Sequence, residues 1–178
     1  MNSIKQIEVL LADRLVGRLA LTKEGLCAFE YAPDWLGSGF SISPFELPLR
    51  SGVFIAKPRP FEGGFGVFDD CLPDGWGLLI VDRYLQQKGI NPRALTLLDR
   101  LALVGSSGRG ALEFRPDHSV VTRQDYADFE KLALEAERIL GSDEYRGKGI
   151  EEFQDRGGSP GGARPKIFAR YEGKEWLG

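Results

Sequence analysis

Apolar side chains at every second position mark three short segments between about residues 4 and 32. This alternation is the pattern of strands that bury one face. The alternating positions are Ile7, Val9 and Leu11, then Leu15, Leu19 and Leu21, then Cys27, Phe29 and Tyr31. Tight turns are predicted at Asp13-Arg14 and at Lys23-Glu24-Gly25, where glycine provides a positive φ. The three segments therefore predict an antiparallel meander.

Helical spacing replaces the alternation after residues 33–66, a stretch rich in proline, glycine and serine. In that stretch we expect loops with one or two short strands. A helix is predicted over residues 73–88, with Pro73 in its first turn, where the missing N–H costs nothing, and with Gly89 as its stop. A second helix is predicted over residues 97–104, because its apolar residues again share one face.

Thr96 stands three residues before Asp99, at the start of that second helix. The spacing favours an N-cap, but the acid is aspartate rather than glutamate or glutamine, which argues against a reciprocal capping box. Residues 110–114 then predict a strand that closes the sheet.

The last sixty residues combine a third helix with a glycine-rich segment. Thr122 is predicted to cap a helix that runs to about Leu140 along one apolar face. Residues 157–166 hold four glycines around Ser159 and Pro160. A strand over residues 167–171 and a turn to a second strand follow, and this hairpin breaks off at Gly178.

Composition and charge narrow the classes of function. The chain has 178 residues, which favours one domain or one domain with a fragment. The 23 Lys and Arg residues against 26 Asp and Glu residues give a net charge of −3, whereas a general nucleic-acid binder has a basic excess. No apolar run approaches a membrane span, and no secretory signal begins the chain. Cys27 and Cys71 lie among apolar residues, which predicts reduced, buried thiols in a cytosol.

The glycine-rich segment is the strongest candidate for chemistry. Glycine N–H groups approach anions closely, and a strand-loop-strand flap covers the ATP phosphates in kinases. Lys166 would add a positive charge there or would be a solvated strand residue. A flexible interdomain linker is the alternative, and composition alone favours it. The candidate phosphate-binding residues are Ser159, Gly161, Gly162 and Lys166.

Two other segments carry weaker signals. Asp69, Asp70 and Asp74 together suggest a cation site, although capping of the following helix explains them better. Residues 106–110 form either an anion nest or, as the composition favours, a plain turn into the next strand. The lone His118 lies in a predicted loop without the converging ligands that a metal needs, so no metal site is predicted.

The groups that phosphoryl transfer requires are missing from the sequence. It contains no His-Arg-Asp and no Asp-Phe-Gly motif to supply a base and metal-holding carboxylates. The Gly-x-Ser-x-Gly spacing at residues 157–161 is followed by a predicted strand rather than a helix, so it is not a nucleophile elbow. The single histidine makes a Ser-His-Asp or Cys-His hydrolase unattractive. No catalytic residue is therefore predicted.

Several segments, in this order and spacing, resemble the N-terminal part of HipA-type serine/threonine kinases, the toxins of bacterial toxin–antitoxin pairs. The resembling segments are residues 15–19 with 29–31, 47–49, 68–77, 103–105 with 110–114, and the glycine-rich residues 159–166. The resemblance runs through nearly the whole chain. In residues 68–77 it departs from the usual Asp-Asn of the family, since Asp69-Asp70 stands there.

The resemblance implies an α+β fold. Residues 1–115 would be an N-terminal subdomain with an antiparallel sheet and packed helices. Residues 116–156 would be a helical connection into the kinase core, and residues 157–178 would be the glycine-rich loop and first strands of a kinase-like N-lobe. Ser159 matches the loop serine that family members autophosphorylate, and Gly161 and Gly162 match positions near the ATP phosphates.

We therefore expect the N-terminal portion of a HipA-like kinase toxin of a type II system, inactive as this chain. It would be a truncation or one piece of a split system. ATP and Mg²⁺ are expected only for the complete kinase. The expected partners are a HipB-like DNA-binding antitoxin or a separate kinase core, with no direct contact to nucleic acid or membrane, in the cytoplasm. The alternative is a standalone, non-enzymatic module that docks on such a core or antitoxin and regulates it.

Overall fold

A computed structural model of the chain describes residues 3–108, 110–119, 129–141, 162, 164–165, 170–172 and 175–177. The chain divides into two units by its contacts. The first comprises Met1–Leu72 and Leu95–Ser119, and the second comprises Pro73–Ala94 and Val120–Gly178. The predicted α+β class is confirmed, because an antiparallel sheet and several helices make up the described residues. The predicted boundaries at residues 115 and 156 stay a prediction.

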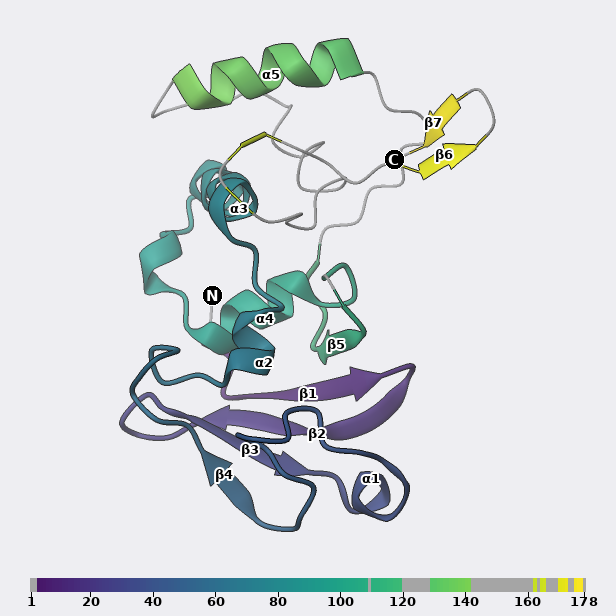
Figure 1. Ribbon diagram of the computed structural model, residues 1–178. Coiled ribbons are helices and arrows are strands. Elements are labelled where there is room, and N and C mark those ends of the chain that lie inside the picture. The colour runs from purple at the N-terminus through teal and green to yellow at the C-terminus, as the bar shows by residue number, and fades with distance from the viewer. Residues whose placement is uncertain are drawn as a thin grey trace. The chain divides into compact units, whose positions relative to one another are not determined.

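The first unit is built on a five-stranded antiparallel sheet (Figure 1). Its strands are β1 (Gln6–Leu11), β2 (Arg14–Leu21), β3 (Cys27–Tyr31), β4 (Val53–Ile55) and β5 (Leu112–Arg115). Their spatial order is β4-β3-β2-β1-β5, so β1 to β3 form the predicted meander and β5 closes the sheet beside β1. The short strand β4 adds the opposite edge.

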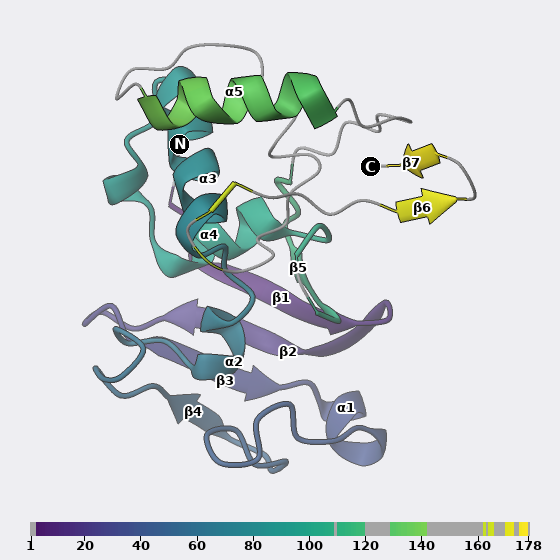
Figure 2. The same ribbon diagram turned by 45° about the horizontal axis from the view of Figure 1, so that its top comes forward.

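The cross-strand register explains why the alternating residues meet. Ile7, Leu19, Phe29 and Phe54 are aligned in one row across four strands, and all four are buried. This row faces α2 (Gly66–Asp69) and α4 (Leu97–Val104), which lie on the same face of the sheet (Figures 1 and 2). Phe68 of α2 packs between the sheet's Phe29 and Phe114, at ring-centroid distances of 5.5 and 6.4 Å.

Two short helices were not predicted. Helix α1 (Pro33–Ser38) and helix α2 (Gly66–Asp69) fall within or at the end of the stretch expected to be loops and short strands. Helix α1 buries only Trp35, so it has no repeating apolar face to detect. Helix α2 is a single turn, and the burial of Phe68 against the sheet holds it.

The second unit contains α3 (Gly75–Gln87), a 3₁₀ turn η1 (Pro92–Ala94), α5 (Phe129–Gly141), and the antiparallel pair β6 (Arg170–Glu172) and β7 (Glu175–Leu177). Trp76 and Ile80 of α3 form a small core with Ala136 and Ile139 of α5. The predicted terminal hairpin is confirmed in β6 and β7, while Thr122 and residues 167–169 lie outside the described residues.

The start of α3 and the cap of α4 differ from the predictions. Pro73 does not lie in the first turn of α3, because Asp74 has extended dihedral angles and serves as the N-cap. At α4, both halves of the capping box are present. The Asp99 side chain reaches back to the Thr96 N–H at 2.9 Å, so the doubt about aspartate at this position was wrong.

The β1–β2 turn lies one residue before the predicted position. Ala12 and Asp13 connect the strands with φ angles of 48° and 61°, as a two-residue type I′ turn requires, while Arg14 already belongs to β2. Neither residue is glycine, although the left-handed region costs an alanine roughly 1–2 kcal/mol.

Replacing Ala12 with glycine is therefore expected to stabilise the chain by about 1 kcal/mol, because glycine adopts this conformation without a Cβ penalty. Urea unfolding should show a higher midpoint with an unchanged slope. The matched control is Ala28→Gly within β3, where the same change is expected to destabilise by about 0.5–1 kcal/mol. An unchanged or lower midpoint for the Ala12 variant would contradict the strain at this turn.

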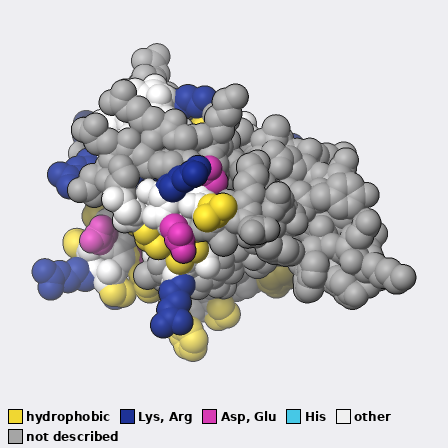
Figure 3. All heavy atoms as spheres, turned by 90° about the horizontal axis from the view of Figure 1, so that it is seen from above, with side chains coloured by type: hydrophobic (Ala, Val, Ile, Leu, Met, Phe, Trp, Pro, Cys, Tyr) yellow, Lys and Arg dark blue, Asp and Glu magenta, His cyan; other side chains and the backbone are white. Residues whose placement is uncertain are grey.

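On the face that Figure 3 shows, Lys and Arg side chains of the described residues lie interspersed with Asp and Glu side chains. Among the residues that the structure describes, no helix is long and apolar enough to cross a membrane.

Candidate functional site

The N-terminal turn of α3 holds one residue of the glycine-rich segment. The Trp76 N–H donates to the Gly162 carbonyl oxygen at 2.9 Å, and the Gly162 N–H faces Asp74 Oδ2 at 3.5 Å. The two partners are separated by more than eighty residues in the sequence. In Figures 1 and 2 the described residues of the glycine-rich segment form the short yellow stretch beside α3. A segment with the composition of a linker is thus fixed at this point to a helix end.

The local backbone explains this contact. The first N–H groups of a helix have no partner within the helix, so an outside acceptor satisfies them. Asp74 is extended and Gly75 has a φ of 44°, which turns the chain sharply into α3. Gly162 itself has a φ of 86°, a conformation that only glycine adopts readily.

The helix end is anchored by burial. Trp76 is 2% exposed and packs with Ile80 against Ala136 and Ile139 of α5. Because a buried tryptophan fixes the backbone that donates to Gly162, the position of this contact depends on the α3–α5 core.

The four predicted phosphate-binding residues are only partly described. Gly162 is exposed and contacts Asp74 and Trp76 as given above, whereas Ser159, Gly161 and Lys166 lie outside the described residues. In the described structure the Gly162 N–H faces the carboxylate of Asp74. Nucleotide binding by the segment stays a prediction.

The three aspartates singled out in the sequence divide between two helices. Asp69 ends α2 and Asp70 is its C-cap, so only Asp74 lies at the start of α3, and the expectation that all three cap that helix was wrong. Burial raises the pKa of Asp69, and the nearby charges of Asp70 and Glu62 raise it further. Among the described residues, no group of three His, Cys, Asp or Glu side chains is placed to hold a metal ion.

The loop after α4 binds an anion from the chain itself. The Ser106 N–H and hydroxyl both donate to Asp117 Oδ2, at 3.0 and 2.6 Å, and the Ser119 N–H donates to Asp117 Oδ1 at 2.8 Å. Burial opposes ionisation of Asp117, but these hydrogen bonds outweigh it and lower the pKa of the carboxyl. The described part of residues 106–110 is therefore a turn closed by Asp117, and Arg109 lies outside the described residues.

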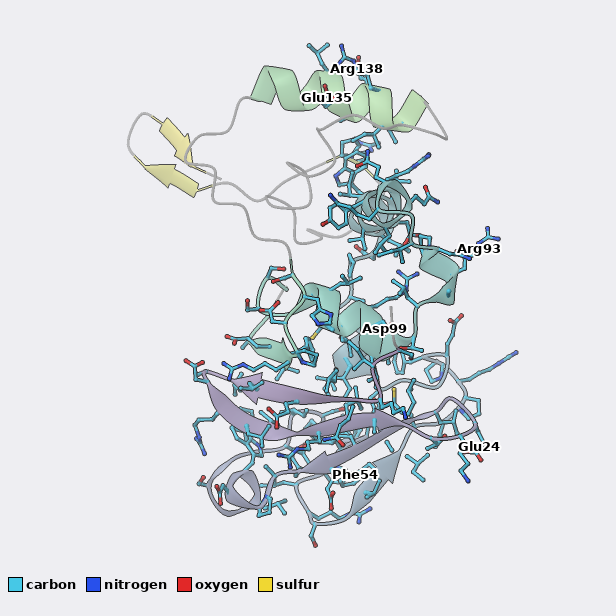
Figure 4. The ribbon with its side chains drawn as sticks, turned by 180° about the vertical axis from the view of Figure 1, so that it is seen from behind. Glu24, Phe54, Arg93, Asp99, Glu135 and Arg138 are labelled. Carbon is cyan, nitrogen blue, oxygen red and sulfur yellow. The ribbon has the colours of Figure 1, made fainter. Side chains whose placement is uncertain are left out.

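Sequence reasoning missed Asp117 and the wider role of Asp99. Asp117 accepts a hydrogen bond from the N–H of Ser119, two residues later in the chain. This local pattern is typical of Asx turns, so the sequence contained a signal for the role of Asp117. Asp99 also accepts from the Ile4 N–H at 2.9 Å (Figure 4). That contact joins residues 95 positions apart, and no sequence pattern predicts it.

The two cysteines are unpaired and buried, as predicted. Burial raises the pKa of Cys27 to about 11, and burial together with the charge of Asp70 raises the pKa of Cys71 to about 11. The thiolate is the reactive form, so neither side chain has the character of a nucleophile near neutral pH.

Comparison with known proteins gives a family match over most of the first unit, together with α3 and η1 of the second. Residues 7–115 match the sequence profile described as the HipA N-terminal domain. The chain belongs to this family. The matched range runs from the second residue of β1 to the end of β5, so it contains all of the five-stranded sheet except Gln6. The family resemblance predicted from the sequence is confirmed, and its segments between residues 15 and 114 lie within the matched range.

A solved HipA structure shares the fold. The chain is similar to HipA of Shewanella oneidensis MR-1, in a toxin–antitoxin complex of HipA, HipB and operator DNA, with a TM-score of 0.57 and 23% sequence identity. The match covers 96% of this chain and 37% of that HipA chain. The chain therefore spans little more than a third of the length of that relative.

Proposed function

We propose that this chain is the N-terminal part of a HipA-like serine/threonine kinase toxin of a type II toxin–antitoxin system, and that it does not transfer phosphate by itself. The observation that carries the proposal is the family match over residues 7–115, together with a fold match that covers 96% of this chain but 37% of the HipA chain. The remaining part of such a kinase would supply the catalytic groups.

The chemistry of phosphoryl transfer supports this division. The reaction needs a base, metal-holding carboxylates and a lysine on the phosphates, positioned around ATP and Mg²⁺. The 178 residues contain no His-Arg-Asp or Asp-Phe-Gly motif. Ser159 and the glycines beside it would be the contribution of this chain, as an autophosphorylation site and a cover for the nucleotide.

A HipB-like antitoxin is the proposed partner, since the similar HipA chain stands in a complex with HipB and operator DNA. The net charge of −3 provides no general attraction to DNA, so any DNA association of this chain would pass through that partner. The buried, unpaired thiols fit the proposed cytoplasmic location.

The test is a phosphorylation assay of the purified chain with labelled ATP and Mg²⁺. We expect no incorporation by the chain alone, and incorporation at Ser159 when a HipA kinase core is added. The control is Ser159→Ala, which should abolish incorporation in the mixture. Robust Ser159-dependent incorporation without added core would overturn the proposed inactivity.

A standalone docking module is the second candidate. The first unit favours it, because it has its own buried core of sheet and helix residues and contains most of the family match. If this candidate holds, adding the chain to a separately purified kinase core or antitoxin will change its activity or DNA binding while Ser159→Ala has no effect. The same mixture therefore separates the two candidates.

A further inference from the structure

Among the residues that the structure describes, strand β4 leaves one backbone edge of the sheet open. It pairs antiparallel with β3 through Val53, Phe54 and Ile55, and it is the last strand in the order β4-β3-β2-β1-β5 (Figure 1). Within the described residues, no strand pairs with its other side. An open edge is a row of donors and acceptors to which an extended segment adds as a further strand.

The register tells which backbone groups face that open edge. The Ala56 N–H donates inward to the Cys27 carbonyl oxygen at 2.8 Å. In an antiparallel ladder the inward-bonded residues alternate, so Phe54 shares this orientation while Val53 and Ile55 direct their N–H and C=O groups outward. The open edge therefore offers two donors and two acceptors in the spacing that a strand requires.

The side chains beside this edge are apolar and exposed. Val53 and Ile55 are 57% and 61% exposed, although β-branched residues on a sheet surface usually pack against neighbours. Phe54 points to the opposite face and is 7% exposed (Figure 4), and the Arg50 guanidinium lies 4.6 Å from its ring centroid. The outer face of β4 would thus gain apolar burial from an added strand.

Positive charge surrounds the edge. Arg50 precedes β4 and Lys57 and Arg59 follow it, and all three side chains are exposed. No acidic residue occurs between Glu46 and Glu62. None of the three cations has a salt bridge with a carboxylate of the described residues. Each end of the open edge therefore has a cationic side chain without a carboxylate partner among the described residues.

The one carboxylate on the adjoining strand already has a cationic neighbour. Glu30 of β3 is aligned with Val53 of β4 on one side and with Arg18 of β2 on the other. Arg18 in turn donates to Glu8 Oε1 of β1 at 3.1 Å. An added strand would lie two strand spacings from Glu30, about 10 Å. The electrostatic repulsion between Glu30 and an acidic peptide is therefore weaker than the attraction of that peptide to Arg50 and Lys57.

The geometry points to a binding site for an extended acidic peptide, which adds to β4 as a sixth strand. Its apolar residues would alternate along the strand beside Val53 and Ile55, and its acidic ends would face Arg50 at one end and Lys57 and Arg59 at the other. A second copy of this chain fits poorly, because pairing two β4 strands in either direction brings cations against cations.

The experiment measures binding of a labelled peptide to the full chain by fluorescence anisotropy. The probe is fluorescein-labelled Asp-Glu-Val-Thr-Val-Thr-Val-Asp-Glu, and its control carries Lys and Arg in place of the four acids. We expect the acidic probe to bind at least about tenfold tighter than the basic control, with affinity that falls as salt rises. Amide exchange should become slower at Val53 and Ile55, which locates the site.

Two variants test the edge and the charge separately. Ile55→Pro removes an outward N–H without touching the ladder to β3, and we expect about tenfold weaker binding, while Ile55→Val should bind as the wild type. Lys57→Glu should also weaken binding about tenfold, whereas Lys5→Glu, an equal charge change beside β1, should not. The charge pair keeps the test decisive if the proline variant fails to fold.

Three outcomes would overturn the inference. The first is an affinity for the acidic probe that neither Ile55→Pro nor Lys57→Glu changes. The second is slower amide exchange outside β4 rather than at Val53 and Ile55. The third is concentration-dependent dimerisation of the chain that becomes stronger in Lys57→Glu. The last result would assign the edge to a second copy of the chain. None of these outcomes bears on phosphate incorporation at Ser159, so the proposed kinase role and this site fail independently.

Discussion

Replacing Gly17 with alanine is expected to destabilise the chain by about 3 kcal/mol or more. A Cβ at Gly17 would lie 2.3 Å from the Glu30 carbonyl oxygen and 2.6 Å from Cζ of Phe29. One neighbour is backbone of β3 and the other is the ring of a fully buried side chain, so neither can move aside cheaply. Overpacking of a core commonly costs 1–3 kcal/mol, and a contact with backbone adds to that.

The matched control for this variant is Gly37→Ala in α1. No atom lies within 4 Å of a Cβ built there, and alanine is favoured over glycine in a helix by roughly 0.5–1 kcal/mol. Urea unfolding of both variants should show a lower midpoint for Gly17→Ala and an equal or higher one for Gly37→Ala. Equal midpoints for the two would show that β2 and β3 are not packed as described.

Replacing Asp99 with alanine is expected to destabilise the chain by about 3 kcal/mol. The Asp99 side chain is 3% exposed and accepts from the Ile4 N–H, the Thr96 N–H and the Thr96 hydroxyl, at 2.9, 2.9 and 2.7 Å. Alanine leaves these partly buried donors without their partner, at roughly 1–3 kcal/mol for a fully buried donor. The control is Asp34→Ala in the first turn of α1, which is exposed and should cost less than about 1 kcal/mol.

The same carboxylate gives a pH dependence with a definite sign. Burial by itself raises the pKa of Asp99, but the hydrogen bonds from Ile4 and Thr96 and the charge of His118 outweigh it, so the pKa is lowered. A lowered pKa contributes stability that is present above the unfolded-state value of about 3.9 and is lost as pH falls through the folded value.

The difference in unfolding free energy between wild type and Asp99→Asn should therefore be full above about pH 5 and should shrink below about pH 4. Because other groups such as Asp117 also titrate there, the difference between the two proteins is the quantity to measure. A difference that grows in acid would contradict the assignment.

The meander of β1 to β3 could be predicted because its information is local. Ile7 and Val9, or Phe29 and Tyr31, alternate at a spacing that only a strand places on one face, and each hairpin closes within a few residues. Helix α4 was predicted at its observed bounds for the same reason, since its apolar face and its Thr96 cap are contiguous in sequence.

The candidate site could be predicted only in part. Gly162 was singled out because the segment around it is rich in glycine. Its partners Asp74 and Trp76 lie in another segment, and composition does not predict which distant residues come into contact. Short elements were missed for a related reason. Helices α1 and α2 depend on single aromatic anchors, Trp35 and Phe68, whose burial is a property of the assembled core.

The sequence alone determined the family through the order of its motifs, and it determined the meander through the alternation of apolar and polar residues. Both patterns consist of residues that are neighbours in the chain. Tertiary structure decided which distant groups meet: Asp99 with Ile4, Ser106 with Asp117, and Val53 and Ile55 at an edge without a partner among the described residues. These pairings join residues brought together by chain folding, and their energies depend on burial and register that no local pattern contains.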